Sequence, residues 1–266
     1  MVAGHGASRV AVAGRALAWD TRHFGLPMGR LEYVLAHEGA SPEAVAAAVD
    51  AALAIARARG LRHLAARVDV ADLRTLGALE ARGFRLLDAL VTYINRPVKD
   101  PAREVREVGA IRHARPEDAA AIVEIARDAY QGYRSRFHLD PHVPDERADA
   151  LYVTWAEETA AMRMADTLLV SEGADGRVIG FLGWRRREPV STQGGMPVFG
   201  GGLGACRRDV PGGYAGLIRA GTVWAHEHGG VAECQTQNYN FAVIRVYEAV
   251  GAHYVRAEYT LHAWLG

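Results

Sequence analysis

The sequence predicts an α/β protein with two related halves, each built from strands and amphipathic helices. Apolar residues at helical spacing alternate along the chain with short apolar runs that are typical of buried strands. The helices also carry clear start and stop signals, best seen where Ser41 precedes Pro42 and Gly60 ends the helix. Finally, a strand, a polar cap and a short helix recur, ending in LEARGF in the first half and YEAVGA in the second.

Composition and charge exclude several classes of protein. The chain has 266 residues, half of them hydrophobic, which is enough for one large or two modest domains. Its formal net charge is zero, and no basic cluster is interleaved with aromatic residues, so a nucleic-acid partner is not expected. No stretch has the ~18–20 apolar residues of a membrane span, and no export signal is evident. We therefore expect a cytoplasmic protein in which Cys206 and Cys234 are buried thiols.

The first half is predicted to form a small α/β domain over residues 1–100. Residues 1–14 are expected to be a loose lead-in, followed by WDTRHFG and a strand over residues 28–36. This motif is either an aromatic-anchored turn, in which Asp20 bonds to the following backbone, or a place where Asp20 and Thr21 face a ligand. After the helix ending at Gly60 come the strand RHLAARV, a helix capped by Asp72 and the strand FRLLDALVTYINRP.

A charged, proline-containing linker over residues 97–108 leads to a second domain over residues 109–266. The segment IRHARPEDAAAIVEIARDAY predicts a short strand and an amphipathic helix. A long loop then enters a helix near Asp145 or Asp149. A hairpin around GADG and the glycine-rich strand PVFGGGLGAC follow, and so many glycines suggest that something approaches the backbone closely.

The most informative stretch begins at Cys206. Pro211, Gly212 and Gly213 come directly before an apolar face of helical spacing, which predicts a strand, a tight turn and a helix N-terminus. Unpaired N–H groups and the helix dipole would converge there, as suits a pyrophosphate, although many glycine turns only start helices. The buried strand VAECQTQ and a short helix opened by Asn240 complete the stretch.

This succession, with N-x-x-V-x-x-x-Y-x-x-x-G at its end, resembles the acetyl-CoA-binding half of the GNAT superfamily of N-acetyltransferases. The superfamily's turn has Arg or Gln, then Gly, then Gly or Ala at defined places, where this chain has Asp209, Gly212 and Tyr214. An aspartate near a pyrophosphate is repulsive unless it turns away and Arg207 or Arg208 supplies the cation. A carrier-protein pantetheine therefore stays open as the donor.

Segments spread over nearly the whole chain resemble one branch, the dTDP-fucosamine N-acetyltransferases of bacterial surface-glycan synthesis. They are WDTRHFG, DLRTLGALEARGF, SRFHLDP, QTQ ahead of the last helix, and TLHAWL. The resemblance implies a C-terminal GNAT fold, a mixed and mostly antiparallel sheet flanked by helices with splayed central strands, behind a truncated GNAT-like α/β N-terminal domain. It also implies acetyl transfer from acetyl-CoA to a nucleotide-linked amino sugar, without metal or membrane, and allows a homodimer.

The resemblance also implies roles for particular residues. Tyr247 would be the general acid, and Asn240 would bond the pantetheine or cap its own helix; a core tyrosine is the alternative for Tyr247. The expected cofactor-binding residues, mostly through their backbone, are Leu203, Ala205, Arg208, Gly212, Gly213, Tyr214, Ala215, Gly216 and Asn240. The expected substrate-binding residues are Asp20, Thr21, Phe24, Arg136, His138 and Gln235. The general base is open among Asp20, Glu233, His138 and a chain of waters.

Three alternatives remain at the level of the sequence. His138, Asp140 and His142 form an H-x-D-x-H run, but Pro141 and the lack of an accompanying motif argue against a metal. The acceptor could instead be a free amino sugar, an antibiotic or an amino acid, and the donor another acyl thioester. A non-catalytic GNAT-like binding domain is the third reading.

Overall fold

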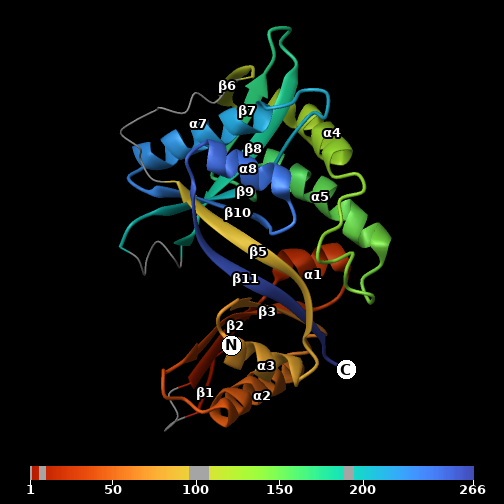
Figure 1. Cartoon of the computed structure of the whole chain (residues 1–266). Helices are drawn as coiled ribbons and strands as arrows, with labels where there is room; N and C mark the ends of the chain where they lie inside the picture. The colour runs from red at the N-terminus through yellow and green to blue at the C-terminus, as the bar shows by residue number, and fades with distance from the viewer. Residues whose placement is uncertain (1, 6–9, 96–107, 189–194) are drawn as a thin grey trace. The chain divides into compact units, whose positions relative to one another are not determined.

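The computed structural model describes residues 2–5, 10–95, 108–188 and 195–266, which form two compact units (Figure 1). Unit 1 comprises Met1–Leu90, Arg136–Val143 and Ala257–Gly266, and unit 2 comprises Val91–Ser135 and Pro144–Arg256. Apart from Val108, the predicted linker lies outside the described residues, and the domain division at residues 100 and 109 stays a prediction. Among the described residues, no helix is both long and apolar enough to cross a membrane.

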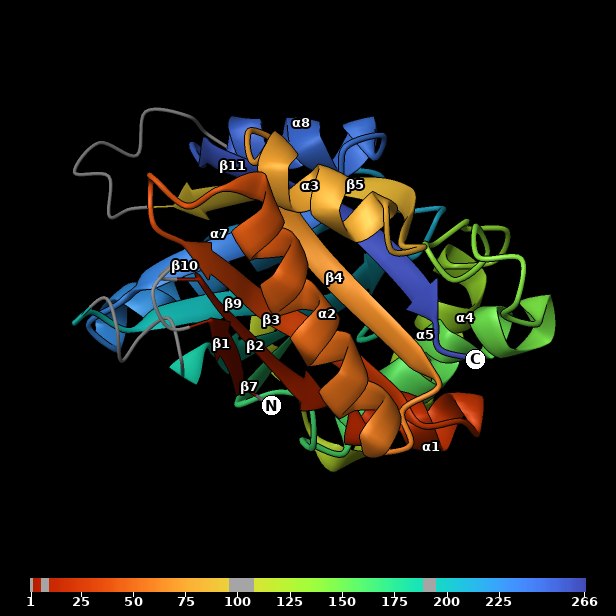
Figure 2. The same ribbon diagram turned by 90° about the horizontal axis from the view of Figure 1, so that it is seen from below.

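Unit 1 is a strand-rich layer with helix α2 packed against it. Its elements are β1 (Val2–His5), β2 (Val10–Ala16), α1 (Ala18–Phe24), β3 (Met28–Ala36), α2 (Pro42–Ala58), β4 (His63–Asp69), α3 (Leu73–Glu80), the start of β5 (Arg85–Asn95) and the end of β11 (His253–Trp264). The strand order is β1-β2-β3-β4-β11, with β3 and β4 parallel and the other neighbours antiparallel. Helix α2 packs on β1, β2 and β3, and Figure 2 shows it lying across these strands.

The helices of unit 1 form where the local signals predict them. The Ser41 hydroxyl accepts the N–H of Ala44 at 3.2 Å, and Pro42 occupies the first helical turn of α2. Asp72 caps α3 by accepting the N–H of Thr75 at 3.0 Å. The apolar face of α2 is buried in the core of the unit, which stabilises the helix beyond its intrinsic propensity.

Two expectations for the N-terminal segment are wrong. Residues 10–16 form strand β2 rather than a loose lead-in, because pairing with β3 overrides the weak strand propensity of its alanines and glycine. The WDTRHFG motif forms helix α1, with Gly25 ending it in the left-handed conformation, rather than a simple turn. The side chain that fixes the following backbone is Thr21, whose hydroxyl accepts the N–H of Met28 at 3.0 Å.

Unit 2 holds the remaining strands and helices. They are β6 (Ala110–His113), a 3₁₀ turn (Pro116–Asp118), α4 (Ala119–Ala129), α5 (Asp145–Ala160), β7 (Thr167–Glu172), β8 (Val178–Arg186), β9 (Val198–Cys206), α7 (Gly213–Glu227), β10 (Val231–Gln237) and α8 (Phe241–Ala249). With the end of β5, the strand order is β5-β10-β9-β8-β7-β6. Strands β6 to β9 pair antiparallel, whereas β9 and β10 are parallel.

Helices cover both faces of this part of the sheet. A Cβ added at Gly180 would meet Leu217 of α7, whereas one added at Gly183 would meet Thr159 of α5. On the α7 face, fully buried Trp184 packs so closely on Gly221 that no side chain fits there. Strand β8 is therefore buried on both faces.

Candidate active site

The glycine turn before α7 presents bare backbone. Gly212 has φ +89° and is the N-cap of α7, and no side chain of the described residues caps the helix there. The first N–H groups of a helix have no partner within it and carry the positive end of its dipole. Gly213 and Gly216 are buried without side chains that would cover these groups. The N–H of Ala215 lies 3.4 Å from the carbonyl of Gly212, and a turn of this kind can bind an anion through its remaining amides.

The charges around the turn are distributed differently from the sequence-based expectation. Asp209 forms an ion pair with Arg177 of the β7–β8 hairpin, at 3.3 Å between Nη2 and Oδ2. Arg207 bonds to Glu124 at 2.9 Å, whereas exposed Arg208 donates to the carbonyl of Gln131 at 2.9 Å. Sequence reasoning missed Arg177 because no local pattern links the hairpin to the turn.

Strands β9 and β10 separate beside the turn. Their parallel pairing covers only three residue pairs and ends at Gly200 and Glu233, although both strands continue beyond these positions. Leu203 and Ala205 are buried and lie in the part of β9 that is paired with β8 but not with β10. The separation confirms the splayed central strands that the resemblance implied, and it leaves the backbone N–H groups of this stretch of β9 without a β10 partner.

The protein itself explains much of the glycine content of β9. A Cβ at Gly204 would lie 2.5 Å from Leu182, and one at Gly200 would collide with Arg187. In addition, the hydroxyl of Tyr130 donates to the carbonyl of Gly204 at 2.8 Å. These close approaches come from neighbouring strands and helix α4, so the glycines alone do not indicate a ligand.

Helix α8 carries the two residues expected to be catalytic. Asn240 is its N-cap: its oxygen accepts the N–H of Val243 at 3.4 Å and its nitrogen donates to Thr236 at 3.0 Å. Tyr247 is only 3% exposed, and its hydroxyl donates to the carbonyl of Gln235 in β10 at 3.2 Å. Such burial fits the core-tyrosine alternative, whereas the bond to β10 directs the hydroxyl toward the strand that borders the separation.

Burial determines the protonation of the phenols around α8. It raises the pKa of Tyr247 well above its ordinary value, and it raises the pKa of Tyr214 in the same direction. The neighbouring phenol of Tyr214 also contributes to raising the pKa of Tyr247. Both hydroxyls are therefore protonated at neutral pH, and that of Tyr247 donates to Gln235. The expectation that Tyr214 contacts the cofactor through its backbone stays a prediction.

A polar network occupies one face of β10. The side chain of Glu233 is 3% exposed, and its carboxylate forms ion pairs with Arg187 at 2.7 Å and with Arg256 at 3.6 Å. The contact with Arg187 lacks the alignment of a hydrogen bond. Gln235, two residues further along the strand, accepts from Arg187 at 3.3 Å and donates to Thr92 at 3.1 Å. Because side chains alternate between the faces of a strand, the sequence alone would have predicted that Glu233 and Gln235 share one face. Their arginine partners depend on tertiary packing.

Most of the expected substrate-binding residues fall in unit 1. Phe24 packs on Phe137 with ring centroids 4.5 Å apart, and the guanidinium of Arg136 lies 4.4 Å from the Phe137 centroid. Asp20, Thr21 and His138 are partly buried in the same unit. Gln235 belongs to unit 2. The structure therefore brings Phe24 and Arg136 together around Phe137, a residue that sequence reasoning passed over.

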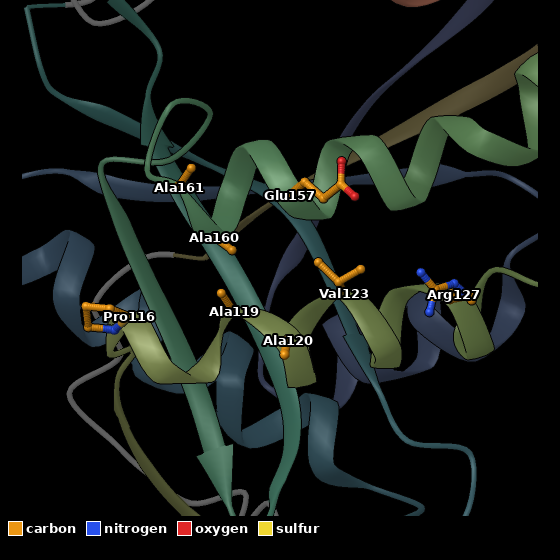
Figure 3. A pocket seen from close by; sticks show the side chains of 8 residues that line it. All are labelled: Pro116, Ala119, Ala120, Val123, Arg127, Glu157, Ala160 and Ala161. Carbon is orange, nitrogen blue, oxygen red and sulfur yellow. The ribbon is translucent and has the colours of Figure 1, made fainter.

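A groove on unit 2 runs between α4 and α5, away from the glycine turn. Small side chains form most of its wall, from Pro116 at one end to Arg127 at the other, with Val123 and Glu157 between them (Figure 3). Its lining includes none of the residues of the glycine turn, β9, β10 or α8 that make up the candidate site.

The arrangement was compared with known proteins. No protein-family model matches the sequence. The crystal structure of a GCN5-related N-acetyltransferase from Sphaerobacter thermophilus superposes with a TM-score of 0.60 at 15% identity, covering 96% of this chain and 79% of that one. The tandem GNAT protein from the clavulanic acid biosynthesis pathway gives a TM-score of 0.58 at 17% identity, covering 91% and 76%.

The chain has the GNAT fold. The likeness extends over more than nine-tenths of the chain and thus includes unit 1, which confirms the predicted fold class of a GNAT fold with an α/β part before it. Among curated proteins, the spore coat polysaccharide biosynthesis protein SpsD of Bacillus subtilis (strain 168) is 29% identical over 151 residues, or 57% of this chain. The chain matches about half of that relative's length (49%).

Proposed function

We propose that the chain is an N-acetyltransferase that moves the acetyl group of acetyl-CoA to the amine of a nucleotide-linked amino sugar by direct attack. The observation that supports this proposal is a combination of two features. The N-terminus of α7 has no side-chain cap, and the pairing of β9 with β10 ends at Gly200 and Glu233. One feature binds a pyrophosphate, and the other admits an extended acyl-pantetheine between two strands.

The acetyl-CoA would be held mainly by backbone. The amides at the start of α7, from Gly213 to Gly216, would bind the pyrophosphate, with Arg208 as the nearby cation. The ion pair of Asp209 with Arg177 offsets the repulsion that an aspartate at this turn would otherwise cause. A backbone N–H that faces away from β8, in the stretch of β9 from Leu203 to Ala205, would stabilise the oxyanion that forms when the amine attacks.

Tyr247 would act on the departing sulfur. A thiol has an ordinary pKa near ~8.5, whereas burial holds the pKa of Tyr247 well above that of a free phenol. Full proton transfer from the phenol to a thiolate is therefore uphill. We infer that Tyr247 stabilises the thiolate by donating a hydrogen bond, which requires its hydroxyl to exchange the carbonyl of Gln235 for the sulfur.

The amino-sugar acceptor is the finer part of the proposal. Its support is the match to SpsD, whose description places that protein in spore coat polysaccharide biosynthesis, together with the sequence segments that resemble dTDP-fucosamine N-acetyltransferases. Among the candidate bases, Glu233 is committed to Arg187 and Arg256. An ordered water is thus a better candidate than Glu233 for accepting the proton of the amine.

The first experiment is a screen of acyl-CoAs against dTDP-amino sugars, free amino sugars and amino acids, read by mass spectrometry. We expect acetylation of at least one dTDP-linked amino sugar and weaker turnover of the free sugar. Turnover confined to another amine would overturn the nucleotide-sugar acceptor while keeping the enzyme class. Absence of binding to any acyl-CoA in calorimetry would overturn the whole proposal.

The second experiment separates catalysis from packing at Tyr247. In Tyr247→Phe we expect kcat to fall about 100-fold, as for loss of one donor to developing negative charge, with the Kd for acetyl-CoA nearly unchanged. Tyr33→Phe, at a 40%-exposed position of β3, is the matched control and should leave both constants unchanged. A wild-type kcat in Tyr247→Phe would assign this tyrosine to the core alone.

A further inference from the structure

Unit 1 contains a buried group of polar side chains that the proposed acetyl transfer does not use. His63, Asp140 and His262 are 0%, 3% and 2% exposed, and each offers one ligand atom within 4.8 Å of the others. The rings of His63 and His262 meet edge to face, with centroids 4.4 Å apart. Two histidines and a carboxylate converge at one point inside the protein.

The strand register explains why these side chains meet. Strands β4 and β11 pair antiparallel, with His63 opposite Trp264 and His262 opposite Ala65. Because side chains alternate between the faces of a strand, His63, Ala65, His262 and Trp264 all lie on the same face. The small side chain of Ala65 leaves room on that face, and the segment 136–143 brings Asp140 onto it.

The hydrogen bonds of the group are incomplete. Asp140 is well supplied: it accepts from Nδ1 of His262 at 2.9 Å, from the indole of Trp264 at 3.0 Å and from the N–H of His142 at 3.1 Å. In contrast, both ring nitrogens of His63 and Nε2 of His262 are buried without a hydrogen-bond partner among the described residues. Buried polar atoms are nearly always paired with protein, water or an ion. Of the three nitrogens, Nε2 of His63 lies 3.8 Å from Oδ2 of Asp140 and so indicates a missing partner where the three side chains meet.

We propose that His63, Asp140 and His262 bind a divalent transition-metal cation, with Zn²⁺ as the leading candidate. Imidazole and carboxylate are established ligands of Zn²⁺, and the same set of two histidines and one carboxylate also suits Fe²⁺. Because three protein ligands leave a tetrahedral site one short, a water completes it.

The distances fit such a cation. Ligand atoms of a tetrahedral zinc site, at bonds of ~2.0 Å, lie about 3.3 Å apart. The observed separations bracket this value: 2.9 Å between Nδ1 of His262 and Oδ2 of Asp140, and 3.8 Å from that oxygen to Nε2 of His63. Two of the three separations thus lie within about half an ångström of the ideal value, and the third, between the two histidines, is within 4.8 Å. On binding, the hydrogen of His262 moves from Nδ1 to Nε2.

The charges around the group permit a cation. Two carboxylates, those of Asp140 and Asp88, attract positive charge at His262, and the guanidinium of Arg136 opposes them. Asp88 is buried, and its Oδ1 has no hydrogen-bond partner among the described residues. Ligation uses the neutral form of each imidazole. The two carboxylates, the guanidinium and the two neutral imidazoles carry a total charge of −1. A bound divalent ion would change this total to +1.

The site would tie three distant pieces of chain together. His63 opens β4, His262 lies near the end of β11, and Asp140 belongs to the segment 136–143, which is separated in sequence from the rest of unit 1. The ligating aspartate is the middle residue of the H-x-D-x-H run, whereas its proposed partners are outside that run. The site is independent of the acetyltransferase proposal and needs no acyl donor.

The experiment uses the full chain without an affinity tag. The protein is stripped with a chelator, equilibrated with Zn²⁺, Co²⁺, Ni²⁺ or anaerobic Fe²⁺, desalted and measured by elemental mass spectrometry. We expect about one metal per chain, and a Co²⁺ absorption spectrum typical of four-coordinate nitrogen and oxygen ligation. His63→Gln and His262→Gln should each weaken the Kd for Zn²⁺ at least about 100-fold.

His37→Gln, at an exposed position outside the group, is the matched control and should keep the wild-type Kd. Wild-type protein that retains none of the four metals overturns the proposal, and so do His63→Gln and His262→Gln variants that bind Zn²⁺ as tightly as wild type. If circular dichroism shows that both variants are unfolded, X-ray absorption of the Zn²⁺-loaded wild type decides. Two imidazole ligands support the proposal, and none overturns it.

Discussion

Replacing Gly212 with alanine tests the central feature of the candidate active site. Its φ of +89° lies in the left-handed region, where a Cβ costs about 1–2 kcal/mol. The added Cβ would meet only Val108, at 3.7 Å, so backbone strain rather than a clash determines the cost. At about 2–4 °C per kcal/mol for a chain of this size, Tm should fall by about 2–8 °C.

The same helix provides a control for strain. Gly229, just beyond the C-terminal end of α7, has φ +73° with nothing within 4 Å of an added Cβ. Gly229→Ala should therefore cost a similar free energy of unfolding. Only Gly212→Ala should move the amides at the start of α7 and so remove a charge-assisted hydrogen bond to the pyrophosphate. Such a bond contributes about 1.5–3 kcal/mol, so the Kd for acetyl-CoA should rise about 10- to 150-fold.

Calorimetry with acetyl-CoA and with S-acetylpantetheine, which lacks the pyrophosphate, distinguishes the two contributions. We expect Gly212→Ala to weaken acetyl-CoA binding and to leave S-acetylpantetheine binding nearly unchanged. If Gly212→Ala binds acetyl-CoA as wild type does, or if Gly229→Ala loses as much affinity, the argument that this turn binds the pyrophosphate is refuted.

Two further predictions follow from buried titratable groups. Hydrogen bonds from Arg112 lower the pKa of Asp118, so the pair's contribution to stability is present above the ordinary carboxyl pKa and is lost as pH falls through the folded value. Asp118→Asn should be less stable by about 1–3 kcal/mol at neutral pH and show a flatter decline below about pH 5 in urea unfolding; an unchanged pH profile would contradict this. Burial raises the pKa of Cys206 and of Cys234 to about 12, and neither forms a disulfide. In native protein at about pH 8 both thiols should react slowly with a disulfide reagent, and quickly once unfolded; rapid labelling of the native protein would refute their burial.

Features that depend on neighbouring residues were predictable. The caps at Ser41, Asp72 and Asn240 and the helices behind them follow from side chains that bond to backbone two or three positions away. The loose lead-in predicted for residues 1–14 is wrong at residues 10–14, which belong to β2. A short strand rich in alanine gives a weak local signal, and its partner strand β3 decides its conformation.

Only part of the candidate site could be predicted from the sequence. Gly212 and Tyr247 follow from spacing within one segment. The ion pair of Asp209 with Arg177 joins elements that are far apart in the chain, and so does that of Glu233 with Arg187. The end of β9–β10 pairing also has no local signature, because pairing depends on how two strands diverge in space.

By itself, the sequence determined the order of most helices and strands, the helix caps and the glycine turn before α7, since each arises from contacts within a few residues. Only the tertiary structure decided that β9 and β10 part beside that turn, and that His63 and His262 share one face of the β4–β11 pair. The physical reason is that hydrophobic spacing tells a strand which face to bury but not which distant strand to pair with. That choice comes from the packing of the whole chain.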